Sequence, residues 1–182
     1  MKTRFTAIDK LITSIAAFAM IMWLGGSIIR TLVTYDLYQP GTLIYKNYSL
    51  DAQNQTIHLI SNMTLYIDVS YALVILATIY LLCRFHRSMK EHGWMFMSAV
   101  MLLLTVIPNL ILIYQDYLFT VGVTWWDATF EAQLVIDYLA FKFVKYSILE
   151  PMVMLAGMTA VILIVCRPLN GILVSKPKKP VE

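Results

Sequence analysis

The sequence predicts an all-α integral membrane protein, a bundle of four transmembrane helices whose two ends both lie on the cytoplasmic side. Three observations predict it: the composition, the length of the apolar stretches and the placement of the positive charges. Of the 182 residues, 59% are hydrophobic and only 14% are charged, which departs from the composition of soluble domains in the direction of membrane proteins. We expect a single membrane domain over residues 1–182.

Four apolar stretches are long enough to cross a hydrocarbon core, which requires about 20 helical residues. Lipid cannot satisfy an exposed backbone, so each stretch is expected to be helical. The predicted spans are residues 11–33, 63–83, 94–114 and 144–166. Between and after them come two external loops that are long enough to be structured, 34–62 and 115–143, and a cytoplasmic tail, 167–182.

Lysine and arginine are concentrated on one side of this arrangement. That side holds Lys2, Arg4, Lys10, Arg84, Arg87, Lys90, Arg167, Lys176, Lys178 and Lys179. Because cytoplasmic loops carry the excess of positive charge, we expect this side to be cytoplasmic. The net charge of +3 thus reports topology and does not indicate a nucleic acid partner.

The cysteines indicate the kind of membrane. Neither predicted external loop contains a cysteine; Cys83 and Cys166 both stand at inner ends of spans. This argues against the disulfide-linked tetraspan proteins of animal cell surfaces. The expected location is the bacterial inner (cytoplasmic) membrane.

Each predicted span carries one polar residue near its outer end. These residues are Arg30, Asp68, Asn109 and Glu150. At about 1.5 Å per residue they lie roughly 5 to 9 Å below the outer boundary. Charged groups in lipid are costly unless they face one another, so we expect Arg30 to pair with Asp68 or Glu150. Nearby residues that could support this polar cluster are Tyr66, Tyr71, Lys145 and Tyr146.

The polar cluster has two interpretations. It can be a structural clasp that sets helix register, or a set of side chains that snorkel to the interface. Alternatively, it can line a proton path or hold a quinone headgroup or cofactor carboxylate. Pro108 and Pro151 stand beside Asn109 and Glu150 and predict kinks in both helices. Such kinks would favour a cavity at this depth.

The second external loop contains apolar residues at helical spacing. The stripe consists of Phe130, Leu134, Tyr138 and Phe141, and follows Trp125 and Trp126. It predicts either an amphipathic helix, on the membrane or continuous with the fourth span, or an aromatic anchor belt.

The sequence contains no pattern for a metal, a haem or a catalytic set. A b-type haem in a membrane bundle normally needs histidines within the spans, and His58, His86 and His92 fall in predicted loops. P-loop, dinucleotide-binding, HExxH and nucleophile-elbow motifs are absent. We therefore expect no catalytic residue and no metal. A quinone, a lipid or a haem held by a partner remain as candidate ligands.

The first span resembles a helix of a known group of proteins. Trp23, Gly25, Gly26 and Arg30 are similar to the first helix of small four-helix membrane proteins related to oxygen-independent protoporphyrinogen oxidases and copper-resistance D-type proteins. The tetrapyrrole enzymes usually have a histidine about two turns before the tryptophan, where this chain has the segment 13–15. The resemblance therefore implies the four-helix architecture and does not imply haem chemistry.

The function that these patterns favour is that of a non-catalytic accessory subunit in a larger membrane complex of respiratory or photosynthetic electron transfer. The spans are apolar nearly all round, and small residues allow close packing with other helices. These are Ala16, Ala17, Ala19, Gly25, Gly26, Ala156, Gly157 and Ala160. The expected partners are other transmembrane subunits and lipids.

Two alternatives stay open. One is a quinone- or tetrapyrrole-linked membrane oxidoreductase that uses Arg30, Asp68 and Glu150. The other is a small proton-coupled transporter that uses the same acids.

Overall fold

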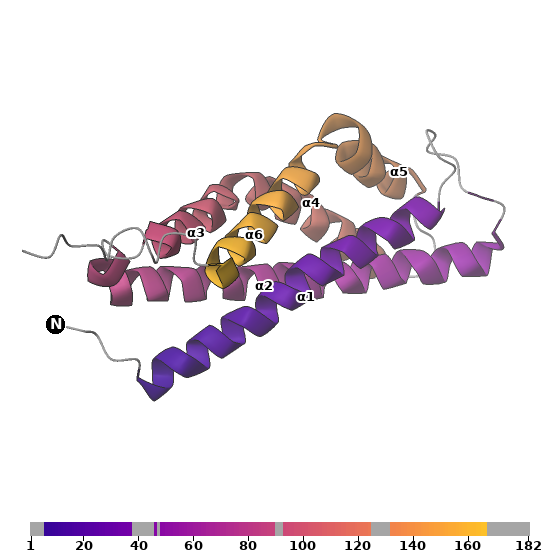
Figure 1. Ribbon diagram of the computed structural model, residues 1–182. Helices are drawn as coiled ribbons and strands as arrows, with labels where there is room; N and C mark the ends of the chain where they lie inside the picture. Colours follow the sequence, from indigo (N-terminus) through magenta and orange to yellow (C-terminus); the bar gives the residue numbers. More distant parts are fainter. Residues whose placement is uncertain (1–5, 38–45, 47, 90–92, 125–131, 167–182) are drawn as a thin grey trace, which may run out of the picture.

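The structure is a computed structural model that describes residues 6–37, 46, 48–89, 93–124 and 132–166. Throughout these residues its regular structure is helical, and the long helices form one bundle (Figure 1). The elements are α1 (Ala7–Leu37), α2 (Leu50–Met89), α3 (Gly93–Leu104), α4 (Val106–Thr124), α5 (Ala132–Ala140), the π-helix η1 (Phe141–Lys145) and α6 (Leu149–Cys166).

Four helical segments are long and apolar enough to cross a membrane. They are Ala7–Asp36, Asp51–His86, Gly93–Val123 and Leu149–Cys166, the third of which comprises α3 and α4. The predicted all-α class with four helices of spanning length is confirmed.

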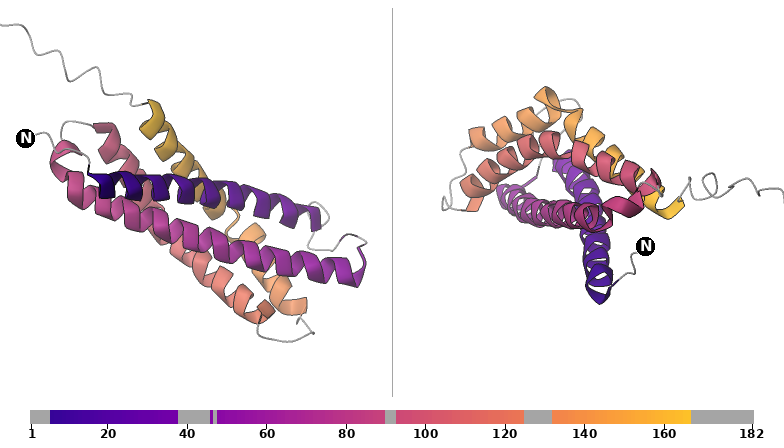
Figure 2. Two further views of the ribbon diagram at one scale, coloured as in Figure 1. Left: turned by 90° about the horizontal axis from the view of Figure 1, so that it is seen from below. Right: turned by 90° about the vertical axis from the view of Figure 1, so that its left-hand side faces the viewer.

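The helices alternate in direction. α1 and α2 pack along one another, α3 and α4 lie against α2, and α6 packs on α3 and contacts α1 and α4 (Figure 2). The start of α1, the end of α2, the start of α3 and the end of α6 lie at one end of the bundle (Figure 1). We call the opposite end, where α1 ends and α2 begins, the outer end, after the orientation that the sequence predicts.

Both predicted external loops are largely helical where the structure describes them. α1 continues to Leu37, α2 already begins at Leu50, and α4 continues to Thr124. Hydropathy marks only the lipid-facing part of a helix, whereas backbone hydrogen bonding continues into its polar turns. With 40 residues, α2 is about 60 Å long, roughly twice the thickness of a hydrocarbon core. The predicted external loops are therefore helical over much of their described length, and their boundaries at the membrane stay a prediction.

The third span is broken at Thr105, between α3 and α4. Pro108 has no N–H group, so the carbonyl of Leu104 loses its helical partner, and the proline ring crowds the same carbonyl. The backbone N–H and the hydroxyl of Thr105 turn to the carbonyl of Leu102, at 3.2 and 2.6 Å. The kink predicted at Pro108 is confirmed.

Pro151 has a different effect from the one predicted. It lies in the first turn of α6, which begins at Leu149. The first N–H groups of a helix have no intrahelical partner, so a proline costs no hydrogen bond there. The kink predicted at this position is wrong because the helix starts there.

Trp23 lies at the centre of the apolar core. Its indole is 2% exposed, and its ring lies 5.0 Å from that of Tyr71. The ring packs on Gly157 of α6, where an added Cβ would come within 2.8 Å of it. Gly26 brings α1 equally close to Ile67 of α2, with a Cβ distance of 2.9 Å. The small residues thus hold three helices around one tryptophan.

A polar contact joins α1 and α2 at the end of the bundle opposite the outer end. Asp9 is fully buried and accepts hydrogen bonds from the backbone N–H and the hydroxyl of Thr6, both at 2.8 Å. This arrangement is a capping box that starts α1. The hydroxyl of Tyr80 on α2 also donates to Asp9, at 3.0 Å, and Arg84 lies 3.6 Å away.

Candidate functional site

A group of four charged side chains and one tyrosine is buried towards the outer end of the bundle. It comprises Arg30 of α1, Asp116 of α4, Tyr138 of α5, Lys142 of η1 and Glu150 of α6, which we call the buried charge network. The side chains of Asp116 and Lys142 are each 3% exposed, and that of Glu150 is 13% exposed. Charges buried to this extent are tolerated only when they are paired.

Asp116 is the centre of the buried charge network. Its Oδ2 accepts a hydrogen bond from Arg30 Nη1 at 2.8 Å. Its Oδ1 accepts one from the Tyr138 hydroxyl at 2.7 Å and lies 2.8 Å from Lys142 Nζ. Three donors from three elements therefore converge on one carboxylate, and α1, α5 and η1 are all tied to α4.

Glu150 closes the buried charge network. Its Oε1 accepts a hydrogen bond from Arg30 Nη2 at 2.5 Å, and its Oε2 lies 3.9 Å from Lys142 Nζ. Lys142 also donates to the Tyr138 hydroxyl at 2.9 Å. Arginine and lysine balance the two carboxylates, so the network as a whole is neutral when all four groups are ionised.

Local structure brings α5 and η1 into the site. Tyr138 and Lys142 are four residues apart, so they share one helix face. The Tyr138 ring stacks on Phe119, one turn beyond Asp116, with centroids 4.1 Å apart and planes 12° apart. In η1 the N–H of Tyr146 donates to the carbonyl of Phe141, five residues earlier, at 2.9 Å. Such π-turns are frequent at functional sites.

Burial shifts the pKa values of Tyr138 and Lys142, the two groups of the network that lie outside the candidate spans. It raises the pKa of the Tyr138 hydroxyl well above its usual value, and the charge of Asp116 adds to this effect. The hydroxyl therefore stays protonated and continues to donate. Burial, followed by the charge of Arg30, lowers the pKa of Lys142, while Asp116 and Glu150 act in the opposite direction. The positive charge of Lys142 depends on these carboxylates.

Of the predicted polar cluster, the structure joins two members. Arg30 pairs with Glu150, which was one of the two predicted pairings. The other, with Asp68, is absent: within the described residues Asp68 makes no hydrogen bond and no ion pair. Arg30 Nη1 instead lies 3.4 Å from the hydroxyl of Thr64, one turn from Asp68. Its guanidinium is already occupied by the two carboxylates of the network.

Asn109 also stays apart from the buried charge network. It is buried on α4, and its backbone N–H donates to the carbonyl of Thr105 at 2.9 Å. Asn109 and Asp116 are seven residues apart and lie two turns apart along α4. Among the described residues, hydrogen bonds and ion pairs therefore join only Arg30 and Glu150 of the four predicted polar residues.

The four predicted supporting residues lie elsewhere. Tyr66 is exposed on the outside of α2. The hydroxyl of Tyr71 bonds to that of Thr105 at 2.9 Å. Lys145 lies over the ring of Tyr146, with Nζ 5.5 Å from the ring centroid. Within the described residues none of them forms a hydrogen bond or an ion pair with the buried charge network.

Sequence reasoning missed Asp116 and Lys142 because both fell in the predicted loop 115–143. Helical spacing could have located Asp116, since it stands seven residues after Asn109 and therefore on the same face. Tyr138 belonged to the predicted apolar stripe, which is indeed helical around it. That helix buries Tyr138 in the protein, and Phe141 is half-buried. Trp125, Trp126, Phe130 and the side chain of Leu134 lie outside the described residues.

A very small cavity lies within the buried charge network. It measures about 10 Å³ and is lined by Arg30, Thr31, Thr34, Tyr138, Lys142 and Glu150. A space of this size holds about one water molecule. The interior of the network therefore has no room for a larger ligand.

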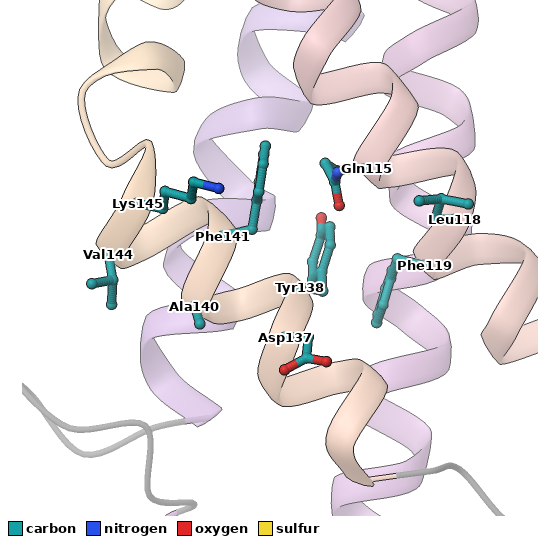
Figure 3. Close-up of a pocket in the computed structure, with 9 residues that line it drawn as sticks. All are labelled: Gln115, Leu118, Phe119, Asp137, Tyr138, Ala140, Phe141, Val144 and Lys145. Atoms are coloured by element: carbon teal, nitrogen blue, oxygen red, sulfur yellow. The ribbon is translucent and has the colours of Figure 1, made fainter.

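Two larger grooves border the buried charge network. The α4/α5 groove, of about 520 Å³, is lined by Gln115, Leu118, Phe119, Asp137, Tyr138, Ala140, Phe141, Val144 and Lys145 (Figure 3). The α1/α6 groove, of about 370 Å³, is lined by Thr31, Tyr35, Lys142, Ser147, Glu150, Pro151, Met154, Leu155 and Met158. Both open at the surface, so an amphipathic molecule could reach the edge of the network from outside.

Among the described residues, no group of three His, Cys, Asp or Glu side chains could hold a metal ion. Comparison with protein-family models, curated proteins and solved structures finds no match. The resemblance of the first span therefore stays a prediction.

Proposed function

We propose that this chain is a non-catalytic accessory subunit of a larger membrane protein complex, in which the buried charge network acts as a clasp. The observation that carries the proposal is that each charged group of the buried charge network is paired with another group of the network. Arg30 and Lys142 are matched by Asp116 and Glu150, and the space among them is about 10 Å³. A catalytic acid or an ion-conducting carboxylate must reach substrate or water. These groups instead reach one another and tie α1, α4, η1 and α6 together.

The outside of the bundle is suited to partners of the same kind. Large apolar side chains are exposed on every candidate span, for example Phe18, Leu76, Leu104 and Val165. In a bilayer such faces contact lipid or the helices of other subunits. The chain therefore presents apolar surface to which other subunits can bind within the membrane, while the buried charge network holds its own helices together.

Location and orientation belong to the same proposal. The complex lies in a bacterial inner membrane, and both ends of the chain are cytoplasmic. The excess of lysine and arginine at one side supports this orientation, and α1 begins and α6 ends at the same end of the bundle (Figure 1). A respiratory or photosynthetic electron-transfer complex is the class of assembly that we expect.

Native purification tests the accessory role. A tagged chain, expressed from its own locus, is extracted in a mild detergent and analysed by native electrophoresis and light scattering. We expect co-migration with other membrane proteins in fixed stoichiometry, at a mass well above the 20.8 kDa of the chain. A homogeneous lone chain that carries a membrane activity by itself would contradict the proposal.

The α1/α6 groove favours a second candidate function, the binding of a quinone. One part of its lining is polar, with Lys142, Ser147 and Glu150, and another is apolar, with Met154 and Met158. This distribution suits a polar head with a hydrocarbon tail. The second candidate is therefore a quinone-linked membrane oxidoreductase or a quinone-binding subunit of one.

Solvent extraction of the purified protein, followed by mass spectrometry, tests this candidate. Met158→Trp fills the groove and should remove a bound quinone. Met152→Trp is the matched control, because Met152 is exposed on the same helix and does not line the groove. If the wild-type extract contains only phospholipid, or if both variants retain the quinone, the second candidate is excluded.

A further inference from the structure

Asp68 is an acid within a membrane span whose charge has no counterion in the described part of the chain. It lies on α2 inside the candidate span Asp51–His86 and is half-buried. Thr64, one turn towards the outer end, contacts Arg30, and Tyr71, about one turn the other way, contacts Thr105. Asp68 thus lies one turn deeper than the buried charge network, beside it but not in it.

The two buried cations among the described residues are already engaged. Arg30 is held by Asp116 and Glu150, and Lys142 is held by Asp116 and Tyr138. Of the other cations whose side chains the structure describes, Lys46 pairs with Asp36, and Arg84 lies near Asp9 at the opposite end of α2. Lys10 is exposed at that same end, and Lys145 is exposed with its Nζ over the Tyr146 ring. A second copy of the chain would bring Arg30 and Lys142 already engaged, and its exposed Lys145 lies outside the candidate spans. A helix of another protein is therefore the expected source of the missing charge at this depth.

Asp68 stands at the boundary between the buried and the exposed sides of α2. Thr64 and Tyr71 are buried. Leu65 and Val69 are 56% and 53% exposed, and Ala72, one turn further on, is exposed as well. The carboxylate is therefore next to a surface strip in which Val69 and Ala72 are small enough for another helix to approach closely.

We propose that Asp68 is the docking site for a lysine or arginine on a transmembrane helix of a partner subunit, which packs along the strip of Leu65, Val69 and Ala72. This inference rests on the proposed accessory function. An unpaired carboxylate and an unpaired basic side chain are each costly in hydrocarbon, and pairing the two lowers the cost of both. Charge complementarity therefore selects both the partner and its depth in the membrane.

Photo-cross-linking in native membranes tests the inference. A benzoylphenylalanine at Val69 of the full chain is activated, and the attached peptide is identified by mass spectrometry. We expect a peptide from the transmembrane helix of another protein, with a lysine or arginine within the span. In Asp68→Asn the yield should fall by about tenfold or more, the effect of losing one close charge pair.

Two further variants make the test specific. Asp51→Asn is the matched control, because it removes the same charge from an exposed residue of the same helix and should leave the yield unchanged. A charge exchange, Asp68→Lys combined with aspartate in place of the partner's basic residue, should restore it. Because Asp68 makes no hydrogen bond among the described residues, Asp68→Asn should unfold at the wild-type temperature.

Several outcomes would overturn the inference. They are a cross-linked helix without a basic residue, an unchanged yield in Asp68→Asn, and an assembled complex without any cross-link from Val69. A carboxyl infrared band in the complex that Asp68→Asn removes would show a neutral Asp68, as a proton-binding role requires. If no complex exists at all, the accessory function itself fails. If the complex persists unchanged in Asp68→Asn, only the docking inference fails.

Discussion

Replacing Arg30 by methionine tests the clasp most directly. The substitution keeps an unbranched side chain in place of the methylene stem of Arg30 but removes both charge-assisted hydrogen bonds to Asp116 and Glu150. Asp116 keeps Lys142 and Tyr138. Glu150 keeps only Lys142, at 3.9 Å, so a buried carboxylate is left uncompensated.

The expected loss of unfolding free energy follows from this charge imbalance. Breaking a buried ion pair by removing one partner costs about 3–5 kcal/mol of unfolding free energy. This corresponds to an increase of the unfolding equilibrium constant by about a hundredfold to a few thousandfold. In the double variant Arg30→Met with Glu150→Met, Lys142 again balances Asp116. We expect it to recover most of the loss, with a coupling energy of about 2–3 kcal/mol.

Reversible unfolding in mixed micelles of a mild detergent and dodecyl sulfate provides the measurement. The fluorescence of Trp23, which is 2% exposed in the core, contributes to the unfolding signal. Lys46→Met is the control, because Lys46 and Asp36 also lie 2.8 Å apart while their side chains are 34% and 74% exposed. Water screens an exposed pair, so this control should unfold like the wild type.

Two results would refute this reasoning. If Arg30→Met is no less stable than Lys46→Met, the buried charge network does not hold the helices together. If the loss of unfolding free energy in the double variant equals the sum of the losses in the two single variants, Arg30 and Glu150 are not coupled. The accessory function would then lose its structural support.

The remaining predictions concern packing and topology. Gly157→Ala places a Cβ within 2.8 Å of Trp23 and should cost about 1–3 kcal/mol in the same unfolding assay. Gly25→Ala has open space within 4 Å and should be neutral or stabilising by up to about 1 kcal/mol; equal effects of the two would contradict the packing. Cys83 and Cys166 are exposed and should react with an impermeant maleimide from one side of the membrane only, the cytoplasmic side. Labelling of the two from opposite sides would disprove the predicted topology.

The sequence alone determined the class of protein. Four apolar stretches of spanning length can be recognised because the transfer of side chains into lipid depends on local composition and length, whatever the tertiary fold. The pairing of Arg30 with Glu150 was predictable for a related reason. Both stand near the outer ends of their spans, and the distance from a span end sets depth in the membrane.

Only the tertiary structure decided which polar groups meet. Asp116 and Lys142 lie in a segment that hydropathy marks as a loop. The structure shows that helices continue through this segment and bring the two side chains together. Asp68 shares the predicted depth of Arg30 and yet stands outside the buried charge network. In spans that are apolar nearly all round, composition does not specify how a helix is rotated about its axis. That rotation is set by side-chain packing between helices, such as Trp23 on Gly157, and it leaves Asp68 at the edge of the bundle.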